Sequence, residues 1–200
     1  WEQARTFAAR IVYAGWMVIT GAGGGIMAAA QGGAGREASF GVNIRLPFEQ
    51  ETNPVMENSG HSITYRYFFN RKVAFLKEAD AVALFPGGFG TMEEAMETLT
   101  LVQTGKCPPM PLVLLEPPGG TYWSSKIDFL RRELLEFGYI DAADLDLFTI
   151  AGSVEEAIEC IRRFYHRYHS MRFVGERLVI RLNNRLSDAQ LERLQDEFPD

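Results

Sequence analysis

The residues best suited to chemistry follow a short apolar run, in the stretch FPGGFGTMEEAMETL from Phe85 to Leu99. Glycine adopts backbone conformations closed to other residues and lets a ligand approach the main chain without a Cβ in the way. The helix predicted next directs unpaired N–H groups and the positive end of its dipole toward that space. Phosphate is the usual group bound there. The stretch therefore predicts a phosphate site at a helix start.

A second glycine-rich turn, TGAGGGIM from Thr20 to Met27, follows the apolar run WMVI. It comes close to GxGxxG but lacks the last glycine, and Ile44 and Arg45 stand where a dinucleotide site would carry an acidic residue. Neither turn continues into the Gly-Lys-Ser/Thr of a P-loop. A dinucleotide cofactor is thus disfavoured. The alternative for either turn taken alone is a tight connection between strand and helix with no ligand.

Two interpretations of Glu94 are open. Thr91 and Glu94 have the spacing of a capping box, in which the Glu94 carboxylate would reach back to the N–H of Thr91. Alternatively, Glu94 acts on a ligand, with a compensating cation from the NRK at Asn70 to Lys72. Arg71 matches a carboxylate or phosphate in bidentate fashion. Its alternative role is a surface ion pair that contributes about 0–1 kcal/mol.

The 200 residues are 46% hydrophobic and 23% charged, which is ordinary for a globular protein. The net charge of -6 argues against a nucleic-acid polymer as partner. Cys107 and Cys160 match no metal spacing and are expected to be free thiols in a reducing cytoplasm. His166 and His169 are i, i+3 on a predicted helix but lack further ligands, so no metal is expected. No apolar run approaches the roughly 20 residues that span a membrane.

Short apolar strands alternate with helices over residues 1–169, which predicts an α/β, Rossmann-like, doubly wound parallel sheet with both faces covered. Strands are expected at 16–21, 40–46, 81–85, 111–116 and 146–151. Helices are expected at 6–15, 23–35, 65–79, 91–105, 124–138 and 153–170, with an irregular stretch at 47–62. Ser153 and Glu156 predict a capping box at the start of the last helix. No strand precedes the first helix, as a doubly wound sheet would usually require, so the chain is interpreted as part of a longer protein.

Residues 170–200 change character and predict a small C-terminal α/β appendage. The run RFVGERLVIRLNNRLSDAQLERLQDEF contains one polar-alternating strand followed by an amphipathic helix. The appendage is expected to pack on the main domain or on a neighbouring subunit.

The stretch PGGFGTMEE resembles the PGGxGTxxE signature of the LOG family, the cytokinin-activating nucleoside 5′-monophosphate phosphoribohydrolases often labelled lysine decarboxylases. The upstream NRK is similar to the Arg-Lys before that signature. The sequence departs from the family pattern in two ways. Phe68 and Phe69 stand where Met-His is common, and the family's first strand is absent. TGAGGGIMAAAQGGAG, GVNIRLP and RFVGERLVIRL are similar to the longer bacterial members. The resemblance implies a Rossmann-like fold, a homodimer, and hydrolysis of a nucleoside 5′-monophosphate to free base and ribose 5-phosphate.

The resemblance also implies roles for individual residues. Arg71 and Glu94 would be the catalytic pair. The phosphate and the rest of the nucleotide would be held by Gly23, Gly24, Gly25, Lys72, Pro86, Gly87, Gly88, Gly90 and Thr91. No metal or organic cofactor would be required.

Parts of the sequence are also compatible with three other functions. A nucleotide-binding sensor or carrier would keep the phosphate site without chemistry. A pyridoxal-phosphate decarboxylase would need a buried Schiff-base lysine, whereas the lysines lie in polar or helix-surface contexts, namely Lys72, Lys77, Lys106 and Lys126. An interaction module would use the aromatic residues of 65–69 and 164–168, which are expected instead to form core and dimer interface.

Overall fold

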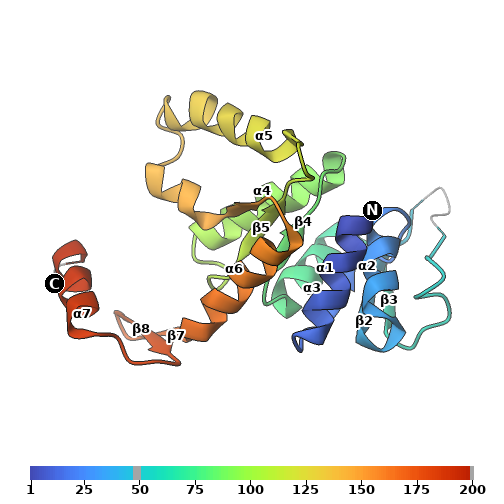
Figure 1. The fold of residues 1–200 in the computed structure, drawn as a ribbon, viewed down its shortest axis with the longest axis horizontal. Helices are drawn as coiled ribbons and strands as arrows, with labels where there is room; N and C mark the ends of the chain where they lie inside the picture. The colour runs from blue at the N-terminus through green and yellow to red at the C-terminus, as the bar shows by residue number, and fades with distance from the viewer. Residues whose placement is uncertain (47–50, 199–200) are drawn as a thin grey trace. The chain divides into compact units, whose positions relative to one another are not determined.

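The structure is a computed structural model that describes residues 1–46 and 51–198 (Figure 1). The chain divides into two compact units, Trp1–Ile161 and Arg162–Asp200. This division falls earlier in the chain than the boundary predicted near Ser170. The first four residues of the stretch predicted to be irregular, 47–50, lie outside the described residues.

The first unit alternates helices and short strands, as predicted. Its helices are α1 (Glu2–Tyr13), α2 (Ile26–Ala34), α3 (Phe68–Glu78), α4 (Phe89–Gln103), α5 (Tyr122–Leu130) and the start of α6 (Val154–Arg167). Its strands are β1 (Val18–Thr20), β2 (Ser39–Ile44), β3 (Ser62–Tyr65), β4 (Val82–Leu84), β5 (Leu112–Leu115) and β6 (Thr149–Ala151). Shorter helical turns are η1 (Arg36–Ala38), η2 (Arg131–Leu135) and η3 (Ala142–Leu147).

The described strands of this unit pair only in parallel, with helices between them, which confirms the Rossmann-like α/β fold. They form two three-stranded sheets, in the orders β1-β2-β3 and β4-β5-β6. The expected single doubly wound sheet is thus present as two parallel halves in the described part of the chain. Because the carboxyl ends of neighbouring parallel strands lie at one edge, each half presents its strand-to-helix turns together.

Helix α1 contacts both halves. It packs on α2, where Gly33 meets the main chain of Arg5 so closely that a Cβ on residue 33 would overlap the Arg5 carbonyl group. The Phe7 ring lies edge-on to Phe85, at the end of β4, with 6.0 Å between centroids. Gln3 Nε2 donates a hydrogen bond of 3.1 Å to the carbonyl oxygen of Glu116, just after β5. Helix α1 therefore links the two parallel halves.

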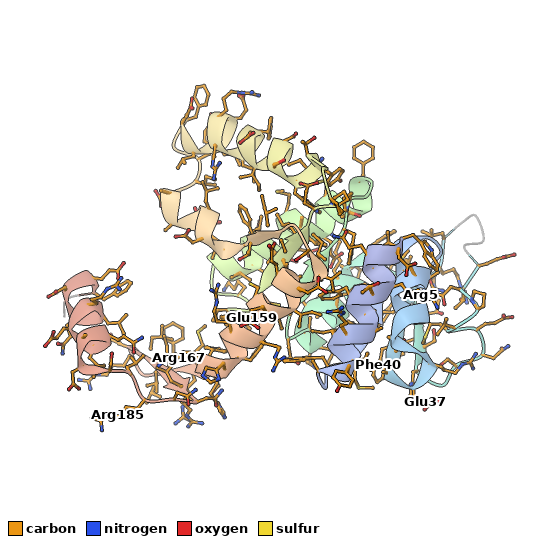
Figure 2. The ribbon with its side chains drawn as sticks, in the orientation of Figure 1. Arg5, Glu37, Phe40, Glu159, Arg167 and Arg185 are labelled. Carbon is orange, nitrogen blue, oxygen red and sulfur yellow. The ribbon has the colours of Figure 1, made fainter. Side chains whose placement is uncertain are left out.

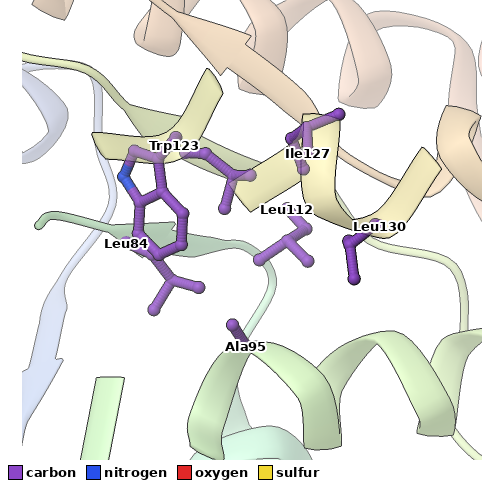
Figure 3. Packing of buried hydrophobic residues seen from close by; sticks show 7 residues of the cluster. Leu84, Ala95, Leu112, Trp123, Ile127 and Leu130 are labelled. Carbon is purple, nitrogen blue, oxygen red and sulfur yellow. The ribbon is translucent and has the colours of Figure 1, made fainter. Parts of the chain in front are cut away.

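Strand β5 lies at the centre of the second half, and its four residues LVLL are all buried. Such a continuous apolar run is expected of a parallel strand covered on both faces. On one side it packs under α4 and α5, as the close view shows (Figure 3). The buried cluster consists of Leu84, Ala95, Leu112, Leu114, Trp123, Ile127 and Leu130.

Two local predictions were wrong in the first unit. A helix was expected from Tyr65, but Ser62–Tyr65 form β3, paired in parallel with β2, and α3 begins only at Phe68. The β-branched and aromatic side chains of this segment suit a strand, and the pairing partner decides in its favour. At α6, Ser153 Oγ accepts from the N–H of Glu156 at 3.1 Å as predicted, but the Glu156 carboxylate accepts from Gly152 rather than from Ser153.

The second unit contains the end of α6, the strands β7 (Tyr168–Val174) and β8 (Arg177–Leu182), and the helix α7 (Asp188–Glu197). The two strands form an antiparallel hairpin. One strand and one helix were expected here, and the missed strand β7 lies where the preceding helix was extended too far. His169 therefore lies in β7 and does not share a helix face with His166. No described helix is both long and apolar enough to span a membrane.

Candidate functional site

The PGGFG turn connects β4 to α4 and leaves the start of that helix accessible. Gly88 occupies the N-cap position, and its carbonyl oxygen accepts hydrogen bonds from the N–H groups of Thr91 and Met92 at 3.1 and 3.2 Å. The side chain of Thr91 lies against Gly87, where a Cβ would collide with it. A Cβ on Gly88 or Gly90 would meet no described atom within 4 Å. The turn thus exposes main-chain groups at a helix N-terminus, as an anion site requires.

Of the two interpretations of Glu94, the capping box with Thr91 is not formed. Helix α4 begins at Phe89, so Thr91 already lies inside the first turn, and no side chain caps the helix at Gly88. Glu94 is instead a helix-interior residue on the second turn. Its carboxylate is therefore not required to hold the helix start.

Burial is the main cause that raises the pKa of the Glu94 carboxyl group above its ordinary value, and the neighbouring carboxylate of Glu97 raises it further. Arg71 and Lys72 act in the opposite direction and favour the charged form, but they do not outweigh burial. The compensating cations expected from this segment are thus present, while the net pKa of Glu94 is still raised. Carboxyl groups with raised pKa values recur at functional sites.

Arg71, on α3, lies close to the first glycine-rich turn. Its Nη1 atom would be 3.8 Å from a Cβ placed on Gly21. Its guanidinium stacks between two rings of its own helix, with Cζ 5.0 Å from the Phe68 centroid and 5.7 Å from that of Phe75. Its Nε atom is buried and has no hydrogen-bond partner among the described residues. A buried donor left unpaired is costly, so this N–H is ready to bind an acceptor from a ligand.

Lys72 is engaged by two carboxylates of α4 in this structure. Its ammonium lies 2.8 Å from Glu93 Oε1 and 3.1 Å from Glu97 Oε2. The hydrogen bond to Glu93 is the main cause that raises the pKa of Lys72. This arrangement ties α3 to α4 and thereby positions Arg71 relative to Glu94. The predicted part of Lys72 in nucleotide binding stays a prediction.

The first glycine-rich turn is held by a buried polar network. Asn53 Nδ2 donates to the carbonyl oxygen of Gly23 at 3.1 Å and to Gln31 Oε1 at 2.6 Å. Gln31 Nε2 in turn donates to the carbonyl oxygen of Phe40 at 3.0 Å. Gly25 caps α2 with a φ of 64°, a conformation that favours glycine. The only sequence signal for this network was a lone glutamine in the otherwise apolar run of α2.

Two further residues next to the PGGFG turn escaped sequence reasoning. Tyr122 Oη donates a hydrogen bond of 2.6 Å to the carbonyl oxygen of Gly87. The buried carboxylate of Glu116 accepts hydrogen bonds from the first N–H groups of α5, at 2.7 Å from Tyr122, 2.7 Å from Trp123 and 3.1 Å from Ser124. Glu116 was visible in the sequence only as the end of an apolar strand.

The predicted site residues thus come from three elements of the first unit. Gly23, Gly24 and Gly25 precede α2, Arg71 and Lys72 lie on α3, and the remaining residues run from β4 into α4, namely Pro86, Gly87, Gly88, Gly90, Thr91 and Glu94. In the described part of the chain, no cluster of three or more His, Cys, Asp or Glu side chains is arranged to hold a metal ion. Cys107 and Cys160 are free thiols.

These features define a Rossmann-like protein with two glycine-rich turns and a charged pair beside them. The chain belongs to the family described as "Possible lysine decarboxylase", whose model matches residues 24–161, and the resemblance to the LOG family is thereby confirmed. It is 32% identical over 102 residues to the probable cytokinin riboside 5′-monophosphate phosphoribohydrolase LOG4 of Oryza sativa subsp. japonica, covering 51% of this chain and 43% of that one. It is 30% identical over 101 residues to the corresponding LOG1 of Arabidopsis thaliana, covering 50% and 46%.

The chain therefore spans less than half the length of these two relatives. Among solved structures, it is similar to the X-ray structure of TM1055, with a TM-score of 0.57 and 24% identity. That match covers 80% of this chain and 86% of the other and supports the fold.

Proposed function

We propose that this protein is a nucleoside 5′-monophosphate phosphoribohydrolase, which hydrolyses the N-glycosidic bond to free base and ribose 5-phosphate. The observation that carries the proposal is the buried, unpaired Nε of Arg71 near the Glu94 carboxyl group, whose pKa is raised. The names of the two plant relatives point to the same reaction class.

The substrate phosphate would bind at the start of α4. There the exposed main chain of Gly88 and Gly90 and the helix dipole favour a negative charge. A phosphate held at this turn supplies binding energy away from the reacting bond, which orients the sugar for reaction.

Cleavage passes through a transition state in which positive charge develops at C1′ of the ribose. The oxygen of a water molecule bonds to C1′ as the C1′–N bond breaks, and the base leaves with the electron pair of that bond and takes up the proton that the water loses. In its charged form, Glu94 orients the water and stabilises the positive charge. Arg71 and Lys72 favour that form, and Arg71 also positions the substrate.

We also infer that the protein is a homodimer. Aromatic and aliphatic side chains just before and along the first half of α3 are exposed in a single chain, and an apolar patch of this kind commonly marks an interface. The exposed side chains are Tyr67, Phe68, Phe69 and Val73. Sedimentation of the full chain should give twice the mass of one chain, and a monomer at micromolar concentration would contradict the inference.

The function is tested with a panel of nucleoside 5′-monophosphates, following the free base by chromatography. Wild type, Glu94→Gln and Arg71→Ala are compared with Glu159→Gln, a matched control on the exposed face of α6 (Figure 2). We expect base release from wild type and the control, and at least a hundredfold loss in the other two, because general acid–base and electrostatic groups contribute about that much or more.

Nucleotide binding to the same proteins is measured by calorimetry. Glu94→Gln should still bind nucleotide. Binding by wild type without any release of base would contradict catalysis and leave a nucleotide-binding protein. If wild type neither binds a nucleotide nor releases a base, both catalysis and nucleotide binding are contradicted.

A further inference from the structure

Two adjacent cations of α3 are held in different ways. The ammonium of Lys72 lies 2.8 and 3.1 Å from two carboxylate oxygens of α4. The guanidinium of Arg71 instead lies over the faces of two aromatic rings, those of Phe68 and Phe75. These two kinds of contact leave the two cations with different capacities to bind a ligand.

A carboxylate that holds a cation also limits what else the cation can bind. The ion pair compensates the charge of the cation, and each hydrogen bond occupies one of its N–H groups. Lys72 donates such a bond of 2.8 Å to Glu93. The charge of Lys72 is thus already compensated within the protein, and Lys72 ties α3 to α4.

An aromatic ring holds a guanidinium group without these restrictions. The face of the ring attracts the cation, while the N–H groups of a guanidinium that lies over the ring stay available as donors. The Cζ atom of Arg71 is 5.0 Å from the centroid of Phe68 and 5.7 Å from that of Phe75. These contacts stabilise the Arg71 side chain and leave its charge uncompensated.

The helix places one ring on each side of Arg71. Phe68 precedes Arg71 by three residues and Phe75 follows it by four, and both spacings bring side chains to the same helix face. A ring therefore stands beside the guanidinium toward each end of α3. Rotation of the Arg71 side chain along the helix is blocked in both directions, so the guanidinium is restricted in orientation.

This orientation brings Arg71 to the end of β1. Its Nη1 atom would lie 3.8 Å from a Cβ placed on Gly21, the residue that follows β1 and opens the first glycine-rich turn. Its Nε atom is buried and has no hydrogen-bond partner among the described residues. Ligands of parallel sheets bind at the carboxyl ends of the strands. Arg71 therefore stands at the ligand-binding edge of its sheet with a donor available.

We propose that Phe68 and Phe75 are positioning residues of the nucleotide site, which hold the Arg71 guanidinium at the end of β1 and leave its charge and N–H groups for an acceptor oxygen of the substrate. The proposal rests on the proposed function for the identity of that substrate. The holding of Arg71 by the two rings rests only on the contacts within α3.

The holding of Arg71 is tested by NMR on the full chain, without any substrate. The Nε–H resonance of Arg71 is assigned by its absence from Arg71→Lys. We expect slow exchange of this proton with solvent in wild type. In Phe75→Leu, which keeps an apolar side chain but no ring, exchange should be at least tenfold faster. Phe75→Tyr keeps the ring and should stay within about twofold of wild type.

Phe69→Leu is the matched control. Phe69 belongs to the same exposed apolar stretch of α3, but its ring stacks on Tyr67. Equal exchange in wild type and Phe75→Leu would overturn the proposal, as would equally fast exchange in Phe69→Leu and Phe75→Leu. If Phe75→Leu does not fold, as judged by circular dichroism, the comparison is made with Phe68→Leu, because Phe68 is 47% exposed and lies outside the core.

The same variants are then compared in the release of base from nucleoside 5′-monophosphates. We expect Phe75→Leu to lower kcat/KM at least fivefold, which is the scale of one partly desolvated cation–π contact. Phe75→Tyr should restore kcat/KM to within about twofold of wild type, which a merely structural loss of packing would not predict. Unchanged kcat/KM in Phe75→Leu would overturn the proposal. If wild type releases no base, the proposed function fails, whereas the exchange rates still support or overturn the holding of Arg71.

Discussion

The hydroxyl group of Tyr122 donates a hydrogen bond to the carbonyl oxygen of Gly87 over 2.6 Å. This bond joins the first residue of α5 to the turn that precedes α4. The Lys126 ammonium lies over the Tyr122 ring, 3.3 Å from its centroid. This cation–π contact further restrains the position of the ring. Tyr122 therefore restrains the turn on which the phosphate is proposed to bind.

We expect Tyr122→Phe to raise the KM for a nucleoside monophosphate about fivefold, because one hydrogen bond of this kind contributes about 1 kcal/mol. The kcat should change by less than twofold, since the hydroxyl does not touch the reacting bond. Steady-state kinetics measure both. Tyr139→Phe, at an exposed position of the same half, is the control. A large fall in kcat at constant KM would contradict the restraining role.

Glu94→Gln should stabilise the fold at neutral pH. Because burial raises the pKa of Glu94 in the folded state, folding binds protons between the ordinary pKa of 4.5 and the raised one. The free energy of unfolding of wild type therefore falls as pH rises through that window, and the uncharged glutamine avoids the loss. Urea unfolding of both proteins from pH 4 to 8 should show the variant gaining on wild type as pH rises. A variant less stable than wild type at pH 8 would contradict the burial argument.

Arg71→Met should raise the pKa of Glu94 further, since Arg71 is the larger of the two cationic contributions that lower it. The titration of Glu94 in this background is followed as the difference in unfolding free energy between Arg71→Met and the double variant Arg71→Met with Glu94→Gln. This difference should begin to change with pH near the same pH as the difference between wild type and Glu94→Gln. It should continue to change up to a higher pH than that difference does. Lys72→Met provides the comparison and should cause a smaller shift. An unchanged pH window would mean that Arg71 and Glu94 are not electrostatically coupled.

Glu116→Ala should lower the stability by about 2–3 kcal/mol, because it leaves several N–H groups at the start of α5 without an acceptor. For a chain of this size the melting temperature should fall by several degrees, as measured by circular dichroism. Glu136→Ala, at an exposed glutamate in the same part of the chain, should change it by less than one degree. Equal melting temperatures for the two variants would contradict the capping role of Glu116.

Asn53→Ala should destabilise the fold by about 1–3 kcal/mol, because it leaves Gln31 Oε1 and the carbonyl oxygen of Gly23 without their buried donor. Nucleotide affinity should fall as well, if the first glycine turn lines the site as proposed. Calorimetric titration measures the affinity, and chemical unfolding measures the stability. Asn58→Gly, at a position with φ of 54°, is the control and should leave nucleotide affinity unchanged.

The sequence predicted the structure correctly where the structure depends on a local pattern of residues. Strand β4, the PGGFG turn and α4 were predicted because an apolar run, glycines and a helical period follow one another within a few residues. Arg71 and Glu94 were singled out by chemistry and by family resemblance. The capping box at Thr91 was wrong because two helix starts fit the same local pattern, and the helix begins at the earlier one.

What escaped prediction depends on contacts between distant residues. Strand β3 exists because β2 lies beside it, and β7 because β8 folds back on it. The role of Glu116 arises from the return of the chain at α5, and that of Asn53 from a glutamine 22 residues earlier. None of these partners is visible in a window of a few residues, where periodicity and propensity act.

The carboxylate of Glu116 also bears on where a phosphate is proposed to bind. Since β4 and β5 are neighbouring parallel strands, α4 and α5 begin at the same edge of their sheet. At one of these two helix starts the protein supplies an anion of its own, tethered and therefore present at a very high effective concentration. A phosphate from solution would compete poorly there, whereas no described side chain caps the start of α4. Of these two helix starts, that of α4 is therefore the one at which the proposed phosphate would bind.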